Sequence, residues 1–206
     1  MGDDRAVAPG RPCFLFAAAF VVASCAAVAH GATPLPLAER LVKAGELAGF
    51  KPLTPTIVKS AREYAAGLGA GTTTAEQRRL ERIGFVAAAT EHLAATRLSG
   101  RDAISDVVQF RTSAGARAEV AHTVQIFGKD AAVRVQSFRV SGIPGAHGLA
   151  VDLPNGKGYD VVFADGPFTY NVGAFTPDKK EPPTAAQVAA AALRLYRRVH
   201  GSPAPR

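Results

Sequence analysis

Residues 159–172 read YDVVFADGPFTYNV, and this stretch decides which class of fold the chain can adopt. Large apolar side chains occupy every second position on either side of Asp165-Gly166: Tyr159, Val161 and Phe163 before it, and Phe168, Tyr170 and Val172 after it. Alternation with a period of two predicts strands with one buried face, and Asp-Gly predicts a type I′ turn between them. Such a turn pairs Phe163 with Phe168 and sets the register of the remaining pairs. The stretch is therefore predicted to be a β-hairpin with one apolar side.

The polar residues of the hairpin share its other side. In the predicted register Asp160 lies directly across from Asn171, and Thr169 is on the same face. Antiparallel sheets commonly expose one face to water. We therefore interpret Asp160, Thr169 and Asn171 either as the solvated face of the sheet or as a polar surface that recognises a ligand.

Residues 149–153, LAVDL, are predicted to form a strand that pairs with the first strand of the hairpin. The length of the connecting loop decides which face its apolar residues occupy, because side chains alternate along a strand. An even loop would place Val151 opposite Asp160, whereas an odd loop of three or five residues would place it opposite Val161. Burial of a single apolar face predicts the odd loop.

Helical periodicity and capping signals surround these strands. Residues 34–84 have a helical pattern, in which Thr54-Pro55 is expected to start one helix. Residues 85–93, FVAAATEHL, are predicted as a strand, although Ala, Glu and Leu also favour helix. Residues 104–110 alternate as a strand does. Thr112 is expected to cap a helix that ends at Gly128, with His122 exposed on it.

The carboxyl-terminal part of the chain carries a capping box, Thr184-Ala-Ala-Gln187, and a helix to His200 is expected after it. A strand-rich region with short connections, flanked by amphipathic helices, predicts an α+β fold in which helices pack on a largely antiparallel sheet. The expected organisation is a helical segment at 34–84, an α/β sandwich at 85–200 and a disordered tail at 201–206.

The first 29 residues are predicted to be a signal peptide. Residues 13–23, CFLFAAAFVVA, form a short apolar core after a charged lead, and small residues follow it. Two cleavage sites are possible. VASC at 22–25 matches a bacterial lipobox, which would leave Cys25 acylated, and Ala27-Val28-Ala29 matches the site of the ordinary signal peptidase. An uncleaved anchor is the third possibility, so the protein is expected outside the cytoplasm, either lipid-anchored or secreted.

Cysteine content and charge exclude several functional classes. Both cysteines, Cys13 and Cys25, lie in the export segment, so the mature domain is expected to have no disulfide, thiol catalyst or cysteine-bound metal. The net charge is +7, and basic residues are concentrated after Lys179. This charge favours weak attraction to anionic lipid or wall polymer. Nucleic-acid binding is not expected of an exported protein in which Tyr196 is the only aromatic residue among the basic residues from Lys179 onward.

The sequence contains no recognisable catalytic, metal or cofactor motif. His147 lies in a turn-rich loop, IPGAHG at 143–148, which follows Arg139 and precedes a strand. Loops on a rigid scaffold often carry binding residues, so Arg139, His147 and Tyr170 join Asp160, Thr169 and Asn171 as candidate ligand-binding residues. No histidine pair has the spacing of metal ligands, and no Gly-x-Ser-x-Gly motif is present. No catalytic residue, metal or cofactor is assigned.

Three segments carry a resemblance to a known group of proteins: VSGIPGAHG at 140–148, VVFADGPFTYNVG at 161–173 and LRLYRRV at 193–199. They resemble exported actinobacterial proteins of unknown function, among them lipoproteins and sensor-like domains, whose α/β/α sandwich is similar to that of PsbP. The resemblance covers residues 85–200 and implies only a fold and an extracytoplasmic location.

Three functional hypotheses follow from these observations. The first is a non-catalytic, envelope-associated module that binds a partner protein, a wall polymer or a small ligand. The second is a structural lipoprotein without a ligand, and the third is a hydrolase that uses His147. A cavity lined by Arg139, His147 and Tyr170 would favour the first hypothesis, a flat and filled surface the second, and a carboxylate or serine beside His147 the third.

Overall fold

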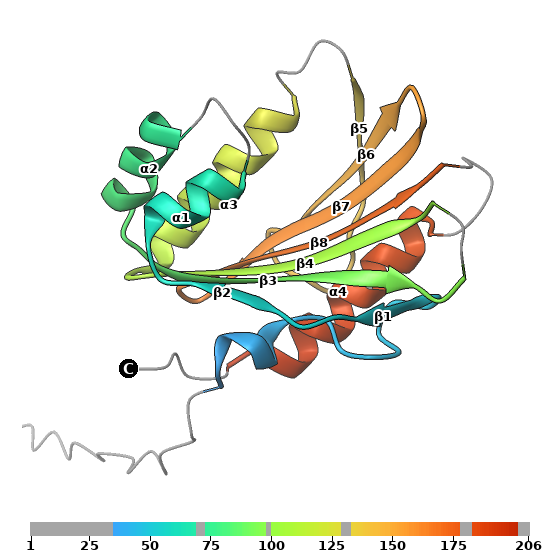
Figure 1. Cartoon of the computed structure of the whole chain (residues 1–206), viewed down its shortest axis with the longest axis horizontal. Coiled ribbons are helices and arrows are strands. Elements are labelled where there is room, and N and C mark those ends of the chain that lie inside the picture. Colours follow the sequence, from blue (N-terminus) through green and yellow to red (C-terminus); the bar gives the residue numbers. More distant parts are fainter. Residues whose placement is uncertain (1–34, 69–72, 98–99, 129–132, 178–182, 202–206) are drawn as a thin grey trace, which may run out of the picture. The chain divides into compact units, whose positions relative to one another are not determined.

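The computed structural model describes residues 35–68, 73–97, 100–128, 133–177 and 183–201, and Ala32 to Arg206 form one compact unit. The chain has five helical elements and eight strands in these ranges (Figure 1). The helical elements are η1 (Leu37–Arg40), α1 (Ala61–Gly67), α2 (Thr73–Arg82), α3 (Ser113–Phe127) and α4 (Ala185–Val199). The strands are β1 (Phe50–Pro52), β2 (Thr56–Val58), β3 (Phe85–Ala95), β4 (Asp102–Phe110), β5 (Arg134–Phe138), β6 (His147–Leu153), β7 (Gly156–Asp165) and β8 (Phe168–Thr176).

The strands form one open, fully antiparallel sheet, which confirms the predicted α+β class. The strand order is β1-β3-β4-β8-β7-β6-β5, and β2 also pairs with β3. Helix α4 covers one face of the sheet, and α1, α2 and α3 lie over the other (Figure 1). Each face therefore has its own apolar core.

The larger core lies between the sheet and α4. Helix α4 has an apolar stripe that is completely buried, formed by Val188, Ala192, Leu195 and Val199. They belong to the same cluster as the apolar face of the hairpin, in which Phe163 stacks on Tyr170 at 4.8 Å between ring centroids. The predicted capping box at Thr184 and Gln187 is present and starts the helix. Local sequence signals thus determined this layer correctly.

The core on the opposite face is smaller and rich in alanine. Phe110 of β4, Leu80 of α2 and Ala116 of α3 form its centre, and Tyr64 stacks on Phe85 at its edge. Thr112 caps α3 as predicted, because its hydroxyl accepts a hydrogen bond from the Gly115 N–H at 3.1 Å. The buried residues of α3 all lie in its first half. Its second half therefore leaves space between helix and sheet.

The predicted hairpin is present as β7 and β8, but its turn and register were predicted wrongly. Asp165 pairs with Phe168 across a Gly166-Pro167 turn, so Phe163 and Phe168 are not partners. A type I′ turn requires positive φ at both central residues, and only Gly166 has it, at 56°. Proline at the second central position has a suitable fixed φ, and its missing N–H is not needed there. The shift is two residues, so every side chain stays on its predicted face.

The prediction of an odd loop between β6 and β7 was wrong. The strands are joined by two residues, Pro154-Asn155, and Val151 pairs with Gly158. Val151 therefore lies on the face opposite to that of Val161, yet both are buried. The prediction assumed that only one face of the sheet is covered. Because α3 packs against β7 from the second side, apolar residues of this strand pair are buried on both faces.

The helical pattern predicted for residues 34–84 holds only in part. Two short strands, β1 and β2, interrupt it, and the helix that was expected to begin at Thr54-Pro55 begins after its N-cap Ser60. Both strands pair with β3, whose strand assignment is confirmed. Strand β4 occupies only one edge of the long β3. Pairing of β1 and β2 with the other edge outweighs the local helical periodicity of residues 34–84.

Basic residues of α4 hold the amino-terminal segment on the sheet. The Arg198 guanidinium binds the Glu46 carboxylate at 2.9 Å and the Leu41 carbonyl at 2.6 Å. Arg40 is completely buried, donates a hydrogen bond to the Tyr170 hydroxyl at 3.0 Å and lies over the Phe168 ring. Part of the basic charge is therefore structural.

Candidate ligand-binding cavity

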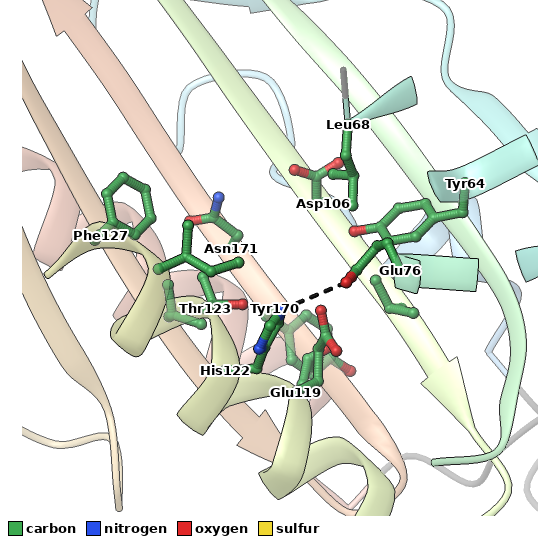
Figure 2. A pocket seen from close by; sticks show the side chains of 14 residues that line it. Tyr64, Leu68, Glu76, Asp106, Glu119, His122, Thr123, Phe127, Tyr170 and Asn171 are labelled. Atoms are coloured by element: carbon green, nitrogen blue, oxygen red, sulfur yellow. Dashed lines mark ion pairs between the residues drawn. The ribbon is translucent and has the colours of Figure 1, made fainter. Parts of the chain in front are cut away.

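A cavity of about 420 Å³ lies on the face of the sheet that α1, α2 and α3 cover (Figure 2). Its floor comes from β4, β7 and β8, and its walls come from the three helices. The lining residues are Tyr64, Leu68, Glu76, Asp106, Val108, Glu119, His122, Thr123, Ile126, Phe127, Val162, Thr169, Tyr170 and Asn171. This volume is within the range of small-molecule sites, about 300 to 1,000 Å³.

The position of α3 explains why the cavity exists. Gly115, in the first turn, brings α3 against the chain that leaves α2: a Cβ atom at Gly115 would lie 2.2 Å from the Ile83 carbonyl oxygen. The first half of α3 is buried by this contact, whereas Ile126 in its last turn is 53% exposed. The open end of the cavity is therefore at the carboxyl-terminal half of α3, where Ile126 and the 55% exposed Leu68 line it.

The floor of the cavity contains two buried polar atoms that have no hydrogen-bond partner among the described residues. Asp106 of β4 and Asn171 of β8 are directly opposite each other in the sheet, and Thr169 is two residues from Asn171 on the same face. Thr169 is only 4% exposed, and neither its Oγ1 nor the Asn171 Oδ1 has a hydrogen-bond partner in the described part of the chain. Leaving a buried polar group unpaired costs about 1 to 3 kcal/mol, so such atoms in a cavity point to a missing partner.

Two half-buried carboxyl groups lie on this face of the sheet, Asp106 in the cavity lining and Asp160 outside it. Burial raises the pKa of Asp106 to about 6, although Thr90 donates a hydrogen bond to it. Burial also raises the pKa of Asp160 to about 7, an effect that the hydrogen bond from Asn171 opposes and the charge of Asp106 reinforces. Both carboxyls therefore change protonation between pH 5 and 8.

The helical wall contains an ionic cluster around Arg79. The Arg79 Nη2 lies 2.5 Å from Glu76 Oε1 and 2.6 Å from Glu119 Oε2, and His122 Nε2 is 3.5 Å from Glu76 Oε2. Figure 2 shows Glu76 and His122 facing each other across the cavity wall. The hydrogen bond from Arg79 lowers the pKa of Glu76, whereas burial raises the pKa of Glu119. The cluster joins α2 to α3, with the single Arg79 guanidinium placed between the Glu76 and Glu119 carboxylates.

The six candidate residues from the sequence separate into two groups. Asp160, Thr169 and Asn171 lie together at the sheet face under the cavity, with Thr169 and Asn171 in its lining. Tyr170 lines it from β8, but its hydroxyl is bound by Arg40 on the other face.

Arg139 and His147 are exposed beside β5 and β6 and do not line the cavity. The His147 side chain has no hydrogen bond or ion pair to any described residue. The carboxylate or serine partner that the hydrolase hypothesis requires is therefore not found in those ranges. Cys25 and the predicted cleavage sites lie outside the described residues.

Sequence reasoning missed Glu76, Asp106, Glu119 and His122. His122 was expected to be exposed, but it is half-buried beside Glu76. One signal was present: Glu119 is on the same helical face as Ala116 and Thr123, and a charged residue within an apolar stripe is unusual. Asp106 stands in the same relation to Val108 and Phe110 along β4.

The described ranges contain neither a candidate metal site nor a candidate membrane-spanning helix. They contain no group of three or more His, Cys, Asp or Glu side chains placed to hold a metal ion. None of the helices in these ranges is long and apolar enough to span a bilayer.

Comparison with known proteins identifies a shared fold. No protein-family model and no curated protein matches the sequence. The extracellular domain of PknH from Mycobacterium tuberculosis has a similar structure, with a TM-score of 0.52 and 16% sequence identity, over 81% of this chain and 100% of that domain. An uncharacterised protein from Mycobacterium smegmatis covers 74% of this chain and 90% of its own, with a TM-score of 0.40 and 10% identity.

The architecture is thus shared with an actinobacterial extracellular domain, in agreement with the predicted fold class and with the actinobacterial resemblance at this coarse level. The more specific likeness to PsbP stays a prediction. At 16% identity the similarity concerns the fold, and the site must be argued from the residues of this chain.

Proposed function

We propose that this protein is an extracytoplasmic, non-catalytic binding module whose ligand is a small molecule in the cavity between α1, α2, α3 and the sheet. The observation that carries this proposal is the pair of unpartnered polar atoms, Thr169 Oγ1 and Asn171 Oδ1, at the floor of the cavity. A ligand that hydrogen-bonds to them would remove the cost of their burial, and this gain would add to the burial of its own apolar surface.

The alternatives fit the site less well. A structural lipoprotein without a ligand was expected to have a flat and filled surface, and a cavity of about 420 Å³ does not match that expectation. A partner protein or a wall polymer would contact the exposed rim formed by Leu68 and Ile126, but it would leave the buried polar atoms at the floor without partners. A small molecule satisfies both the rim and the floor.

A neutral fluorescent probe, N-phenyl-1-naphthylamine, tests whether the cavity accepts apolar molecules. We expect saturable binding of one probe per protein and a roughly fivefold weaker affinity in Ile126→Ser, because about 1 kcal/mol of apolar burial at the rim is lost. The matched control is Leu53→Ser, since Leu53 and Ile126 are both 53% exposed and only Ile126 lines the cavity. Absence of saturable binding, or equal effects of the two substitutions, would contradict the proposed site.

The extracytoplasmic location is part of the same proposal and rests on the signal peptide predicted in residues 1–29. Lipid anchoring at Cys25 is the finer alternative. Metabolic labelling with a fatty-acid analogue in a bacterial host should label the wild-type protein and leave Cys25→Ala unlabelled. If both proteins remain unlabelled while both are exported, the lipid-anchored form is excluded and the secreted form stands.

A further inference from the structure

We propose that the ligand of the cavity is an amphipathic organic cation, with a primary ammonium group at Asp106, Asn171 and Thr169 and an apolar chain toward Leu68 and Ile126. This inference rests on the proposed function and specifies its ligand class. It is carried by the distribution of charge, hydrogen-bond acceptors and apolar surface within the cavity.

Carboxylates outnumber their ion-pair partners along the cavity lining. Glu76, Asp106 and Glu119 are its three carboxylates, and Arg79 forms ion pairs with Glu76 and Glu119. No ion pair to Asp106 is found among the described residues. The Thr90 hydroxyl donates a hydrogen bond to it, the charge of His92 lowers its pKa, and its own charge raises the pKa of Asp160. Asp106 is therefore a half-buried carboxyl that lines the cavity without an ion pair to any described residue, and a cationic ligand would provide one.

Hydrogen-bond acceptors lie beside Asp106 on the same face of the sheet. Asn171 uses its amide N–H to donate to Asp160, which leaves Oδ1, a pure acceptor, without a partner. Thr169 Oγ1, on a side chain more than nine-tenths buried, is the second free oxygen. Together with the Asp106 carboxylate they provide three acceptors on one face of adjacent strands, and a primary ammonium group has three N–H donors. An anionic group would face two carboxyls and an amide oxygen.

Apolar side chains line the rest of the cavity and form a path away from the polar floor. Val108 and Val162 pair with Thr169 and Asn171 in the sheet, and Phe127 lies to the side of Asn171 (Figure 2). The exposed Ile126 and Leu68 complete the apolar part of the lining. Burial of an alkyl chain along this path gains about 0.8 kcal/mol per methylene group. The cavity is thus polar and acidic at its inner end and apolar at its outer end.

The test compares three probes with the same chain, octylammonium, octanol and octanoate, by isothermal titration calorimetry of the exported protein at pH 8. We expect octylammonium to bind at least tenfold more tightly than octanol, and octanoate to bind more weakly than both. Equal affinity for octylammonium and octanol, or a preference for octanoate, would overturn the cationic class while leaving a small-molecule cavity in place. Failure of all three probes and of N-phenyl-1-naphthylamine would overturn the proposed function as well.

Substitution of the carboxyl that carries the inference gives the second readout. In Asp106→Asn the affinity for octylammonium should fall about tenfold, to that of octanol, and the affinity for octanol should not change. Glu63→Gln, which removes an exposed carboxylate of α1 outside the cavity lining, is the matched control for general electrostatic attraction. An undiminished preference for octylammonium in Asp106→Asn would overturn the assignment of the ammonium position.

A titration of the wild-type protein tests the inference without any substitution. Because burial raises the pKa of Asp106 to about 6, protonation should weaken octylammonium binding about tenfold between pH 8 and pH 5, while octanol binding stays constant. Other ionisable groups face this site from the helices and from the sheet: Tyr64, Glu76, Glu119, His122, His92 and Asp160. Comparison with Asp106→Asn separates their effect from that of Asp106. A preference that does not change with pH would overturn the inference.

Discussion

Replacement of Asp160 by Asn is expected to stabilise the protein by about 4 kcal/mol at pH 8 and by almost nothing at pH 4. Burial raises the pKa of this carboxyl from an ordinary value of 3.8 to about 7. Between these values the folded state binds more protons than the unfolded state, so stability falls as the pH rises through this range and is lowest above pH 7. A difference of about three pH units corresponds to about 4 kcal/mol at roughly 1.36 kcal/mol each. The neutral amide of Asn avoids this cost.

Urea unfolding followed by circular dichroism at pH 4, 6 and 8 measures the effect. The free energy of unfolding of Asp160→Asn should exceed that of the wild type by an amount that increases at each step. Asp152→Asn, on the neighbouring strand β6, is the control for the loss of one aspartate. A variant that is no more stable than the wild type at pH 8, or a difference that is constant with pH, would contradict the burial of a proton-binding Asp160.

This prediction connects stability with function. The desolvated carboxyl groups of Asp106 and Asp160 lower the stability of the folded state, and a chain selected for stability alone would replace them. Asp160 accepts a hydrogen bond from the amide N–H of Asn171. The other end of this amide, Asn171 Oδ1, then lies at the cavity floor without a partner among the described residues. The destabilising residue and the proposed ammonium site are thus joined by one side chain. We expect the stabilised Asp160→Asn variant to bind octylammonium more weakly than the wild type.

Replacement of Gly115 by Ala is expected to destabilise the protein by about 2 to 3 kcal/mol. Helix propensity alone predicts the opposite sign, since Ala is favoured over Gly by about 1 kcal/mol within a helix. The added Cβ would lie 2.2 Å from the Ile83 carbonyl oxygen and 3.2 Å from the Phe110 Cβ. The first of these atoms belongs to the backbone and cannot turn away, so α3 must shift from its place against α2 and β4.

Gly67→Ala is the matched control for this substitution. Gly67 ends α1, and a Cβ there would have no atom within 4 Å. Its replacement should leave stability unchanged or raise it by up to about 1 kcal/mol. Both variants can be compared by urea unfolding at pH 6. Because Gly115 sets the position of α3, Gly115→Ala should also weaken binding of N-phenyl-1-naphthylamine, and equal behaviour of the two glycine variants would contradict the close approach.

Much of the fold was predictable because its signals are local. The hairpin strands follow from alternation around Gly166, and both strands kept their faces although the register moved by two residues. The caps at Thr112 and Thr184 fixed the starts of α3 and α4, since a hydroxyl and an N–H three residues later are sufficient for them. Asp160, Thr169 and Asn171 were correctly grouped on one face for the same reason.

The sequence by itself thus determined the class of fold, the two capped helices and the polar face of the hairpin, because each depends on residues within a few positions of one another. Only the tertiary structure decided what covers that face. Whether Val151 is buried, whether His122 meets Glu76 and whether Asp106 borders a cavity all depend on where α3 packs, and Gly115 settles that through a contact with Ile83, 32 positions away in the chain. Local periodicity carries no information about such a contact, because its energy comes from close packing between segments that are distant in sequence.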